Sequence, residues 1–273
     1  MAFYFALLLL VLTVVFGLVW LLDRLFFRRR RMLRATATGE PVRDPWWVDW
    51  SRSLFPVVLA VLLLRSFVAA PFRIPSGSMM PTLDVGDFIL VNKFAYGLRL
   101  PVFHTKIVSI GEPKRGDIVV FRPPWQPNQD WIKRIVGLPG DRVVVKGEHV
   151  WINGKLVQDQ TIGPYRGDAD KKVQRYVMNN GGILLREHLG GIEHQIIKMP
   201  SLNQPQRDFP PNVPNEHNPV IVPKNCYFVM GDNRDDSDDS RYKGCVPEKD
   251  LVGKAFFIWF SRASLSRIGT ILH

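Results

Sequence analysis

The sequence predicts a mainly β protein, in which an antiparallel β domain is anchored by two N-terminal transmembrane helices. Three observations support this fold class. Residues 2–22 carry no charged side chain, residues 54–70 form a second apolar run, and the chain beyond residue 70 consists of short β-branched and aromatic runs. About 20 apolar residues in a helix cross the hydrocarbon core of a bilayer, and short runs bounded by Gly, Pro, Asp and Asn are typical of strands.

Residues 1–22 are predicted to be a retained transmembrane helix rather than a cleaved signal peptide. They lack a positively charged start, and no cleavage site of small residues follows them. Residues 23–53 contain eight arginines and no lysine, and short basic loops stay in the cytoplasm. We therefore expect residues 23–53 to be a cytoplasmic arginine-rich loop and residues 71–273 to form an extracytoplasmic β domain.

Residues 54–70 are predicted to be the second transmembrane helix, although this run is short and contains Arg65. Arg65 lies close to the end of the run, where a guanidinium can reach the lipid headgroups. Trp46, Trp47 and Trp50 precede the run and indicate a membrane interface. The alternative is a buried helix of a soluble protein.

The charge and the cysteines argue against a nucleic-acid partner and a zinc site, and they leave open whether a disulfide forms. The net charge is +11, but the arginine-rich loop explains part of it. The scattered remainder fits a domain beside anionic lipid rather than a nucleic-acid partner. Cys226 and Cys245 are the two cysteines, and the sequence does not decide whether they form a disulfide. Neither has zinc-ligand spacing, and we expect no metal or organic cofactor.

Beyond residue 70 the pattern favours an antiparallel fold that is sandwich-like or barrel-like. Asn153-Gly154 predicts a hairpin turn, since both residues tolerate positive φ. Residues 158–219 are predicted to be a β-ribbon excursion distant from the chemistry, with weak strands at 176–178 and 195–199 and a proline-rich loop at 201–219. The other strands are predicted at residues 88–91, 118–121, 132–136, 142–145, 150–152, 155–157, 227–230 and 255–260.

A candidate nucleophile lies in the string IPSGSMMPTL, residues 74–83. Ser76 and Ser78 flank Gly77 in a turn bounded by prolines, and glycine lets the backbone approach a substrate closely. A serine on such a turn exposes its hydroxyl, and backbone N–H groups there can bind an oxyanion. Taken alone, the string is more typical of an ordinary loop.

A candidate base lies in the string WIKRIVGLPGD, residues 131–141. Strand alternation puts Lys133 and Arg134 on opposite faces. To act as a base near neutral pH, the pKa of Lys133 must fall by about two to three from about 10.4, which burial among apolar side chains can achieve. Arg134 cannot take this role, because a guanidinium does not deprotonate in proteins. The alternative is that Lys133 only protects a strand edge from aggregation.

The third segment, residues 231–241, has the string GDNRDDSDDSR. It does not have the ligand spacing of an EF-hand calcium loop. A solvated acidic turn is one interpretation. The two interleaved arginines instead predict internal Asp–Arg ion pairs that make the loop rigid. Ser237 in this loop could hydrogen-bond the lysine amine and orient it.

These segments, in this order after two apolar runs, resemble those of bacterial type I signal peptidases. The resemblance is highly specific only when the segments are taken jointly, and it covers most of the chain outside residues 1–22 and 158–219. It is carried by the strings IPSGSMMPTL, GDFILVNKFAYG, RGDIVVF, WIKRIVGLPGD, GDNRDDSDDSRYKGCVPE and LVGKAFFIWF.

The resemblance implies a membrane-anchored serine protease with a Ser/Lys dyad. Matching motif positions make Ser78 the nucleophile and Lys133 the general base, with the Ser76 hydroxyl in the oxyanion hole. Ser237 would orient Lys133. Asp239 and Arg241 would support the site through a salt bridge. The family usually has Asn at the position of Asp236, which places one more negative charge near the dyad.

The resemblance also implies the substrate and the location. Such enzymes remove signal peptides from exported preproteins after small residues in an Ala-x-Ala-like pattern. The expected location is the bacterial inner membrane, multi-pass, near the export machinery, with the catalytic domain on the periplasmic side. Phe72 and Trp259 are candidates for contact with the bilayer. The candidate walls of the substrate pockets, for each of which core packing is the alternative, are Phe72, Ile74, Met79, Leu83, Trp131 and Ile132.

Two other functions are compatible with the pattern. One is a non-enzymatic, membrane-tethered peptide-binding module of the export machinery, which would leave the serine and the lysine without a purpose. The other is a hydrolase with a Ser/His/Asp triad, although no Gly-x-Ser-x-Gly motif occurs. The histidines available to it are His104, His149, His188, His194, His217 and His273.

Overall fold

The computed structural model describes residues 2–38, 41, 44–63, 69–99, 106–167, 171–202 and 214–273. Arg65, the end of the second predicted span and most of the predicted proline-rich loop lie outside the described residues. The chain forms two compact units. One is helical and comprises residues 1–69 with 99–107, and the other is the β unit of residues 70–98 with 108–273.

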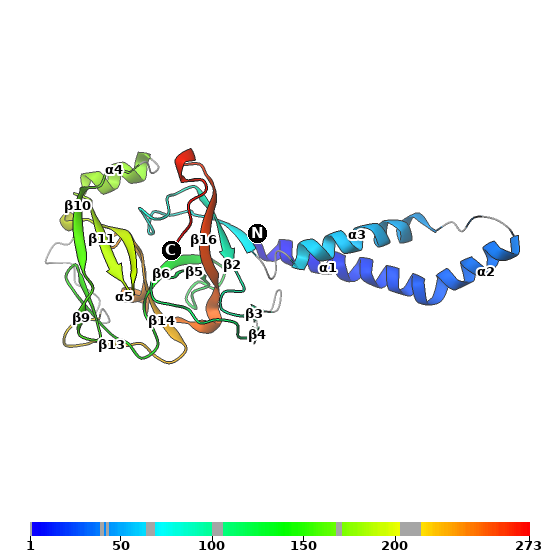
Figure 1. Ribbon diagram of the computed structural model, residues 1–273, viewed down its shortest axis with the longest axis horizontal. Helices are drawn as coiled ribbons and strands as arrows, with labels where there is room; N and C mark the ends of the chain where they lie inside the picture. The colour runs from blue at the N-terminus through cyan, green and yellow to red at the C-terminus, as the bar shows by residue number, and fades with distance from the viewer. Residues whose placement is uncertain are drawn as a thin grey trace. The chain divides into compact units, whose positions relative to one another are not determined.

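In the helical unit, the first helix is longer than expected. Helix α1 (Ala2–Leu22) continues through a π-helical turn (η1, Asp23–Phe27) into α2 (Arg28–Thr38), and a second helix, α3, spans Trp46–Leu63 (Figure 1). The interpretation of residues 23–53 as a loop is therefore wrong for most of its length. Arginine is a good helix former, so the basic segment extends the apolar helix instead of ending it.

Side chains join the two long helices of this unit. The Trp20 ring stacks on Phe55 with centroids 5.7 Å apart, and Gly17 leaves room for that phenyl ring. Arg31 donates hydrogen bonds to Asp23 at 2.6 Å and to Asp44 at 3.0 Å. Two helical segments, Leu7–Ala37 and Trp46–Leu63, are long and apolar enough to cross a membrane.

The β unit is built on a seven-stranded sheet with the order β1-β2-β16-β5-β6-β14-β15. The pairs from β2 through β15 are antiparallel, as the sequence predicts, and Figure 1 shows β5 and β6 at the centre of this sheet. Its strands are β1 (Ala69–Arg73), β2 (Asp87–Asn92), β5 (Ile118–Phe121), β6 (Trp131–Gly137), β14 (Cys226–Met230), β15 (Val246–Pro247) and β16 (Leu251–Ser261).

Three smaller sheets complete the strand content of the described residues, with the orders β10-β11-β12, β13-β7-β8-β9 and β3-β4. Asn153 and Gly154 have φ of 53° and 79° at the β8–β9 hairpin, which confirms the predicted turn. These strands are β3 (Leu98–Arg99), β4 (Lys106–Val108), β7 (Arg142–Lys146), β8 (His149–Ile152), β9 (Lys155–Leu156), β10 (Asp159–Pro164), β11 (Ile183–Leu189), β12 (Ile192–Lys198) and β13 (Val220–Ile221).

Short helices connect these strands, and one of them corrects a prediction. Residues 176–178, predicted as a weak strand, belong to helix α4. Val173 and Val177 are four residues apart, so a helix places both on one face, and there they join a cluster around Met80. The short helices are α4 (Lys171–Asn179), η3 (Pro200–Leu202), α5 (Ser240–Lys243), η4 (Glu248–Asp250) and η5 (Leu265–Arg267).

The principal hydrophobic core packs the candidate serine turn against the large sheet. Ile74, Met79 and Leu83 from the turn share a buried cluster with β2, β5, β6 and β16. Apolar residues placed on both sides of Ser78 therefore anchor the turn, since each buried side chain contributes roughly 1.5–3 kcal/mol.

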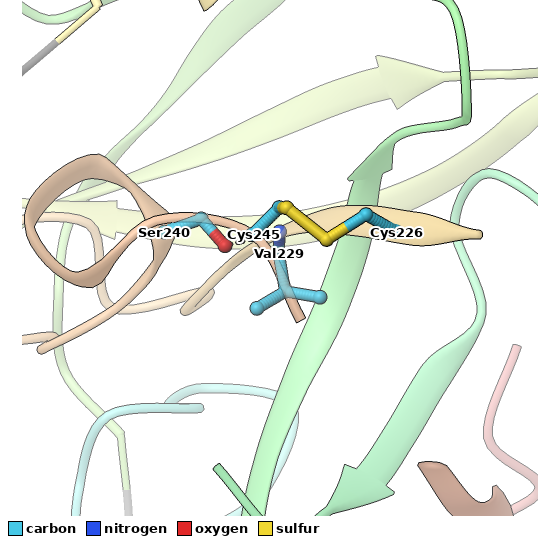
Figure 2. Close-up of a disulfide and its surroundings, with 4 residues drawn as sticks. All are labelled: Cys226, Val229, Ser240 and Cys245. Atoms are coloured by element: carbon cyan, nitrogen blue, oxygen red, sulfur yellow. Dashed lines mark hydrogen bonds between the residues drawn. A yellow bond between two sulfur atoms is a disulfide. The ribbon is translucent and has the colours of Figure 1, made fainter. Parts of the chain in front are cut away.

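A disulfide joins Cys226 at the start of β14 to Cys245 just before β15, with Cα atoms 5.8 Å apart (Figure 2). The structure therefore decides the question that the sequence left open. Nearby, the Val229 N–H donates to Ser240 Oγ at 2.9 Å. The crosslink closes a loop that contains the whole acidic segment, residues 231–241.

Reduction of this disulfide is expected to lower the free energy of unfolding by about 3 kcal/mol, because the bond removes chain entropy from the unfolded state. The measurement is urea unfolding of the purified protein with and without reductant. The double variant Cys226→Ala/Cys245→Ala serves as the control and should not respond to reductant. Equal urea midpoints for the oxidised and reduced wild type would contradict the prediction.

Candidate active site

The candidate nucleophile lies on the connection between β1 and β2. The backbone of Ile74 pairs with Asp87 and Gly86 at 2.8 and 3.0 Å, which closes the base of this connection. Ser78 is 8% exposed, whereas Ser76 is exposed. Among the described residues, the Ser78 N–H donates to no backbone or side-chain acceptor. The turn thus carries the shielded Ser78 hydroxyl and the Ser78 N–H, which is available as a hydrogen-bond donor.

Lys133 projects from β6, an interior strand between β5 and β14. Its Nζ lies 2.6 Å from Ser78 Oγ, within hydrogen-bond distance, and the residue is 4% exposed. The Trp131 ring covers the amine, with its centroid 5.6 Å from Nζ. Arg134 points to the opposite face, toward Asp232. The alternation predicted from the sequence therefore separates the two cations as expected.

The surroundings of Lys133 favour its neutral form. Burial is the largest effect and lowers the pKa of Lys133 to about 8, against opposing contributions from the carboxylates of Asp239 and Asp238. Arg241 also lowers it. At neutral pH a useful fraction of the lysine is therefore free amine, which an exposed lysine with a pKa near 10.4 does not provide.

Ser78 and Lys133 face an open cleft of about 370 Å³. Two of the six predicted wall residues, Trp131 and Ile132, line it. The other four do not: Ile74, Met79 and Leu83 are buried in the principal core, and Phe72 packs against that core. The remaining lining residues are Pro75, Ser76, Gly77, Gln129, Asp130, Asp236 and Asp238.

The acidic loop supports the site, but one of its contacts differs from the expectation. The Ser237 hydroxyl donates to Asp239 at 2.8 Å, and no hydrogen bond joins it to Lys133 in the described part of the chain. The prediction that Ser237 orients the lysine directly is therefore wrong for this structure. Ser237 is instead held by a carboxylate that also accepts from Gly231 N–H at 3.0 Å.

The predicted salt bridge between Asp239 and Arg241 is present, with N···O distances of 2.8 and 2.9 Å. Burial alone would raise the pKa of Asp239, but the Arg241 guanidinium holds it below its usual range. Asp239 also accepts from the Arg241 N–H and caps helix α5. The carboxylate is thus a buried anion whose oxygens are fully used.

Gly231 is a point where the acidic loop packs tightly against the turn of the candidate nucleophile. A methyl group on its Cα would overlap both Ser237 Oγ and the Ser78 carbonyl oxygen. A larger residue at this position would push the loop away from the serine turn. Here the requirement for glycine is one of space, because no side chain fits between the two segments.

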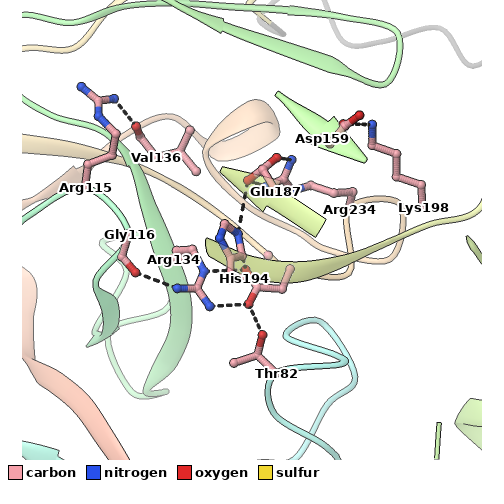
Figure 3. Close-up of polar contacts among 12 residues, drawn as sticks. Thr82, Arg115, Gly116, Arg134, Val136, Asp159, Glu187, His194, Lys198 and Arg234 are labelled. Atoms are coloured by element: carbon pink, nitrogen blue, oxygen red, sulfur yellow. Dashed lines mark hydrogen bonds and ion pairs between the residues drawn. The ribbon is translucent and has the colours of Figure 1, made fainter. Parts of the chain in front are cut away.

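On the far side of β6, buried ion pairs connect this strand to the rest of the unit (Figure 3). Arg134 binds Asp232 at 2.8 and 2.9 Å, and Thr82 donates to the same carboxylate at 2.5 Å. The sequence predicts that Arg234 pairs with an aspartate of its own loop. In the structure Arg234 instead binds Glu187 on β11. No local sequence pattern near Glu187 predicts this ion pair with Arg234.

The predicted excursion, residues 158–219, is not distant from the chemistry. Its strand β12 contacts the acidic loop, where the Ile197 N–H donates to the Asp232 carbonyl and its carbonyl accepts from the Arg234 N–H, both at 2.9 Å. Its helix α4 brings Val173 against Gly77, beside the nucleophile. The expectation was wrong because a polar composition indicates exposure of one face, and the other face is buried here.

The residues that sequence reasoning missed include Asn233, which is fully buried and hydrogen-bonds the serine turn. Its position inside the acidic string is the signal that could have identified it.

No histidine lines the cleft among the described residues, and His104 lies outside them. His194 is buried between Glu187 and Asp232, at 3.2 and 3.8 Å. Among the described residues, the triad alternative therefore has no histidine beside Ser78.

A serine hydroxyl held against a buried, partly neutral amine is the arrangement of a serine hydrolase that uses lysine as its base. Comparison with known proteins agrees with this class. Residues 47–260 match the family described as signal peptidase, peptidase S26. The chain belongs to this family.

Two relatives of similar length support the assignment. The chain is 41% identical to signal peptidase I of Pseudomonas aeruginosa, covering 99% of this chain and 100% of that protein. It is 36% identical to signal peptidase I of Haemophilus influenzae, with coverages of 94% and 86%. A solved signal peptidase I from Enterococcus faecalis is 29% identical and covers 54% of this chain and 98% of that chain, with a TM-score of 0.30.

Substitution Lys133→Met is expected to raise the free energy of unfolding at pH 7 by about 3 kcal/mol. The reason is that the pKa of Lys133 is about 8 in the folded protein and 10.5 when unfolded, and each unit corresponds to about 1.36 kcal/mol. The unfolded state binds more protons between these two values, so wild-type stability rises with pH there. The difference between variant and wild type should shrink through that window.

Urea unfolding at a series of pH values from 6 to 11 measures this difference. Lys155→Met, at an exposed lysine on β9, is the matched control and should show no such pH dependence. A difference for Lys133→Met that is independent of pH would contradict the depressed pKa.

Proposed function

We propose that this enzyme removes signal peptides from exported preproteins by serine–lysine catalysis, with Ser78 as the nucleophile and Lys133 as the general base. The observation that carries the proposal is the 2.6 Å separation of Ser78 Oγ and Lys133 Nζ, two nearly buried residues at the edge of an open cleft. The relatives in this family are signal peptidases I. A non-enzymatic binding module is not favoured, because binding alone has no use for a buried free amine at a hydroxyl.

The reaction starts when Lys133 takes the proton of Ser78 as Oγ attacks the scissile carbonyl. The developing oxyanion is stabilised by the Ser78 N–H and the Ser76 hydroxyl. Both residues line the cleft. The protonated lysine then donates to the leaving amine, which leaves an acyl-enzyme. Lys133, neutral again, activates a water molecule that hydrolyses the ester.

The substrate binds as an extended chain and pairs with backbone at the cleft, as in other cases of β-strand addition. Trp131 and Ile132 form apolar walls beside the dyad. Phe72, Ile74, Met79 and Leu83 lie in or against the core next to the cleft, and we retain them as candidates that bound the pockets from behind. Shallow apolar pockets accept a methyl group, which accounts for cleavage after an Ala-x-Ala sequence.

We propose that the protein is a multi-pass enzyme of the bacterial inner membrane, with the β unit on the periplasmic side near the export machinery. The two long apolar helices support this proposal. The arginine-rich segment between the helices supports a cytoplasmic location for that connection. The disulfide of the β unit supports the same topology, because such bonds persist in oxidising compartments.

Substitution Ser78→Ala or Lys133→Ala is expected to lower kcat at least about 10³-fold, since members of a catalytic unit fail together. Ser76→Ala should lower kcat about 10²-fold with little change in KM, because it removes one oxyanion donor. The assay is cleavage of a purified preprotein by the detergent-solubilised enzyme, read by gel and by N-terminal sequencing of the product. Undiminished cleavage by the Ser78 or Lys133 variant would sink the proposal.

The pH dependence of kcat/KM should show a rising limb with a midpoint near 8, where burial places the pKa of Lys133. The free amine is the active form, so the rate rises about tenfold per pH unit below the midpoint and levels off above it. Asp238→Asn removes a carboxylate that raises this pKa, and the midpoint should move to lower pH by a few tenths of a unit or more. A movement to higher pH would contradict the free-base role.

A further inference from the structure

Asn233 forms two hydrogen bonds with the backbone of the nucleophile turn, on the buried side of the turn. It is fully buried, its N–H donates to the Ser78 carbonyl at 3.0 Å, and its side-chain amide donates to the Gly77 carbonyl at 3.1 Å. It therefore binds the carbonyl groups on both sides of the Ser78 α-carbon. The catalytic steps described above use neither contact.

The contact with Gly77 has a direct geometric consequence for catalysis. The Gly77 carbonyl and the Ser78 N–H belong to the same peptide group. Because a trans peptide group is planar, its C=O and N–H point in opposite directions. An amide that holds the carbonyl on the buried side therefore turns the N–H toward the other side. This N–H has no other acceptor among the described residues.

We propose that Asn233 is a positioning residue that aims the Ser78 N–H at the oxyanion formed during acyl transfer. The inference rests on the proposed function and deepens it, since it assigns a residue to the oxyanion hole that touches no substrate. A donor on the carbonyl side also polarises the peptide group, which strengthens the N–H as a donor. The Met80 N–H donates to the same carbonyl at 3.1 Å and assists this orientation.

Asn233 is itself held firmly by its neighbours on both sides. Asp232 is bound by Arg134 of the lysine strand, and Arg234 is bound by Glu187 of β11 (Figure 3). The backbone at Asn233 also forms a parallel bridge with Ile197 of β12. The β10–β12 sheet thus holds the segment that carries Asn233.

Asn233→Leu tests the assignment, because leucine keeps the branched shape and the backbone N–H but cannot donate from its side chain. We expect kcat for preprotein cleavage to fall about 10–100-fold, with KM within about twofold of wild type. A substrate-like peptide aldehyde, which forms a tetrahedral adduct with the serine, should lose affinity by the same factor as kcat. The midpoint of the pH profile should not change, because Lys133 is not altered.

Asn233→Ala is the second variant, in case leucine does not fit. Asn92→Ala is the matched control, because the Asn92 side chain also bonds a backbone group, accepting from the Phe94 N–H at 2.9 Å, and in the described part of the chain no hydrogen bond joins it to the turn. The inference is overturned if a folded Asn233 variant keeps wild-type kcat, if kcat falls while aldehyde affinity is retained, or if the pH midpoint moves. Loss of cooperative unfolding in both variants would also overturn it, in favour of a purely structural role.

Ser78→Ala, assayed in parallel, separates this inference from the proposed function. If Ser78→Ala is inactive and Asn233→Leu is fully active, the positioning role alone fails. If Ser78→Ala cleaves the preprotein like the wild type, the proposed function fails whatever the Asn233 variants do.

Discussion

The burial of one amine beside one hydroxyl is the constraint on which the β unit depends. A charged lysine in an apolar site is costly, and a neutral one much less so, which is why desolvation lowers its pKa. An interior strand supplies this burial, because β6 has neighbours on both sides and packs against the principal core. The same core holds the serine turn. The fold therefore sets the position of the hydroxyl and the protonation of the amine together.

The arrangement of the nearby carboxylates keeps that amine from becoming a simple ion pair. Asp239 would raise the pKa of Lys133, yet its oxygens are used by Arg241, Ser237 and the Gly231 N–H. The guanidinium of Arg241 lowers the pKa of Lys133 and so offsets part of the effect of this anion. On the other face of β6, Asp232 is neutralised by Arg134 in the same way. These two buried carboxylates are thus paired with arginines, which leaves Lys133 as the titratable cation among the residues that line the cleft.

Residues 158–219 have a structural role that their composition conceals. The sheet β10–β12 and helix α4 contact the acidic loop and the serine turn through Ile197, Arg234 and Val173. Three segments therefore meet at the site. The serine turn and strand β6 carry Ser78 and Lys133, and the acidic loop, which residues 158–219 support, fixes their relative position. Ion pairs buried at such a junction contribute little net stability when intact, but breaking one partner is strongly destabilising.

The sequence by itself determined the features that depend on local periodicity and turn chemistry. The apolar helices, the strands around the dyad, the Asn153-Gly154 turn and the opposite orientation of Lys133 and Arg134 all follow from the positions of neighbouring residues. The roles of Ser78 and Lys133 came from the joint resemblance of the motifs to a known family. Only the tertiary structure decided the partners of Ser237 and Arg234, the pairing of the cysteines, the contacts of Asn233 and the place of residues 158–219. These contacts join residues as far apart as 156 positions in the chain, and sheet packing, which no local pattern encodes, brings them together.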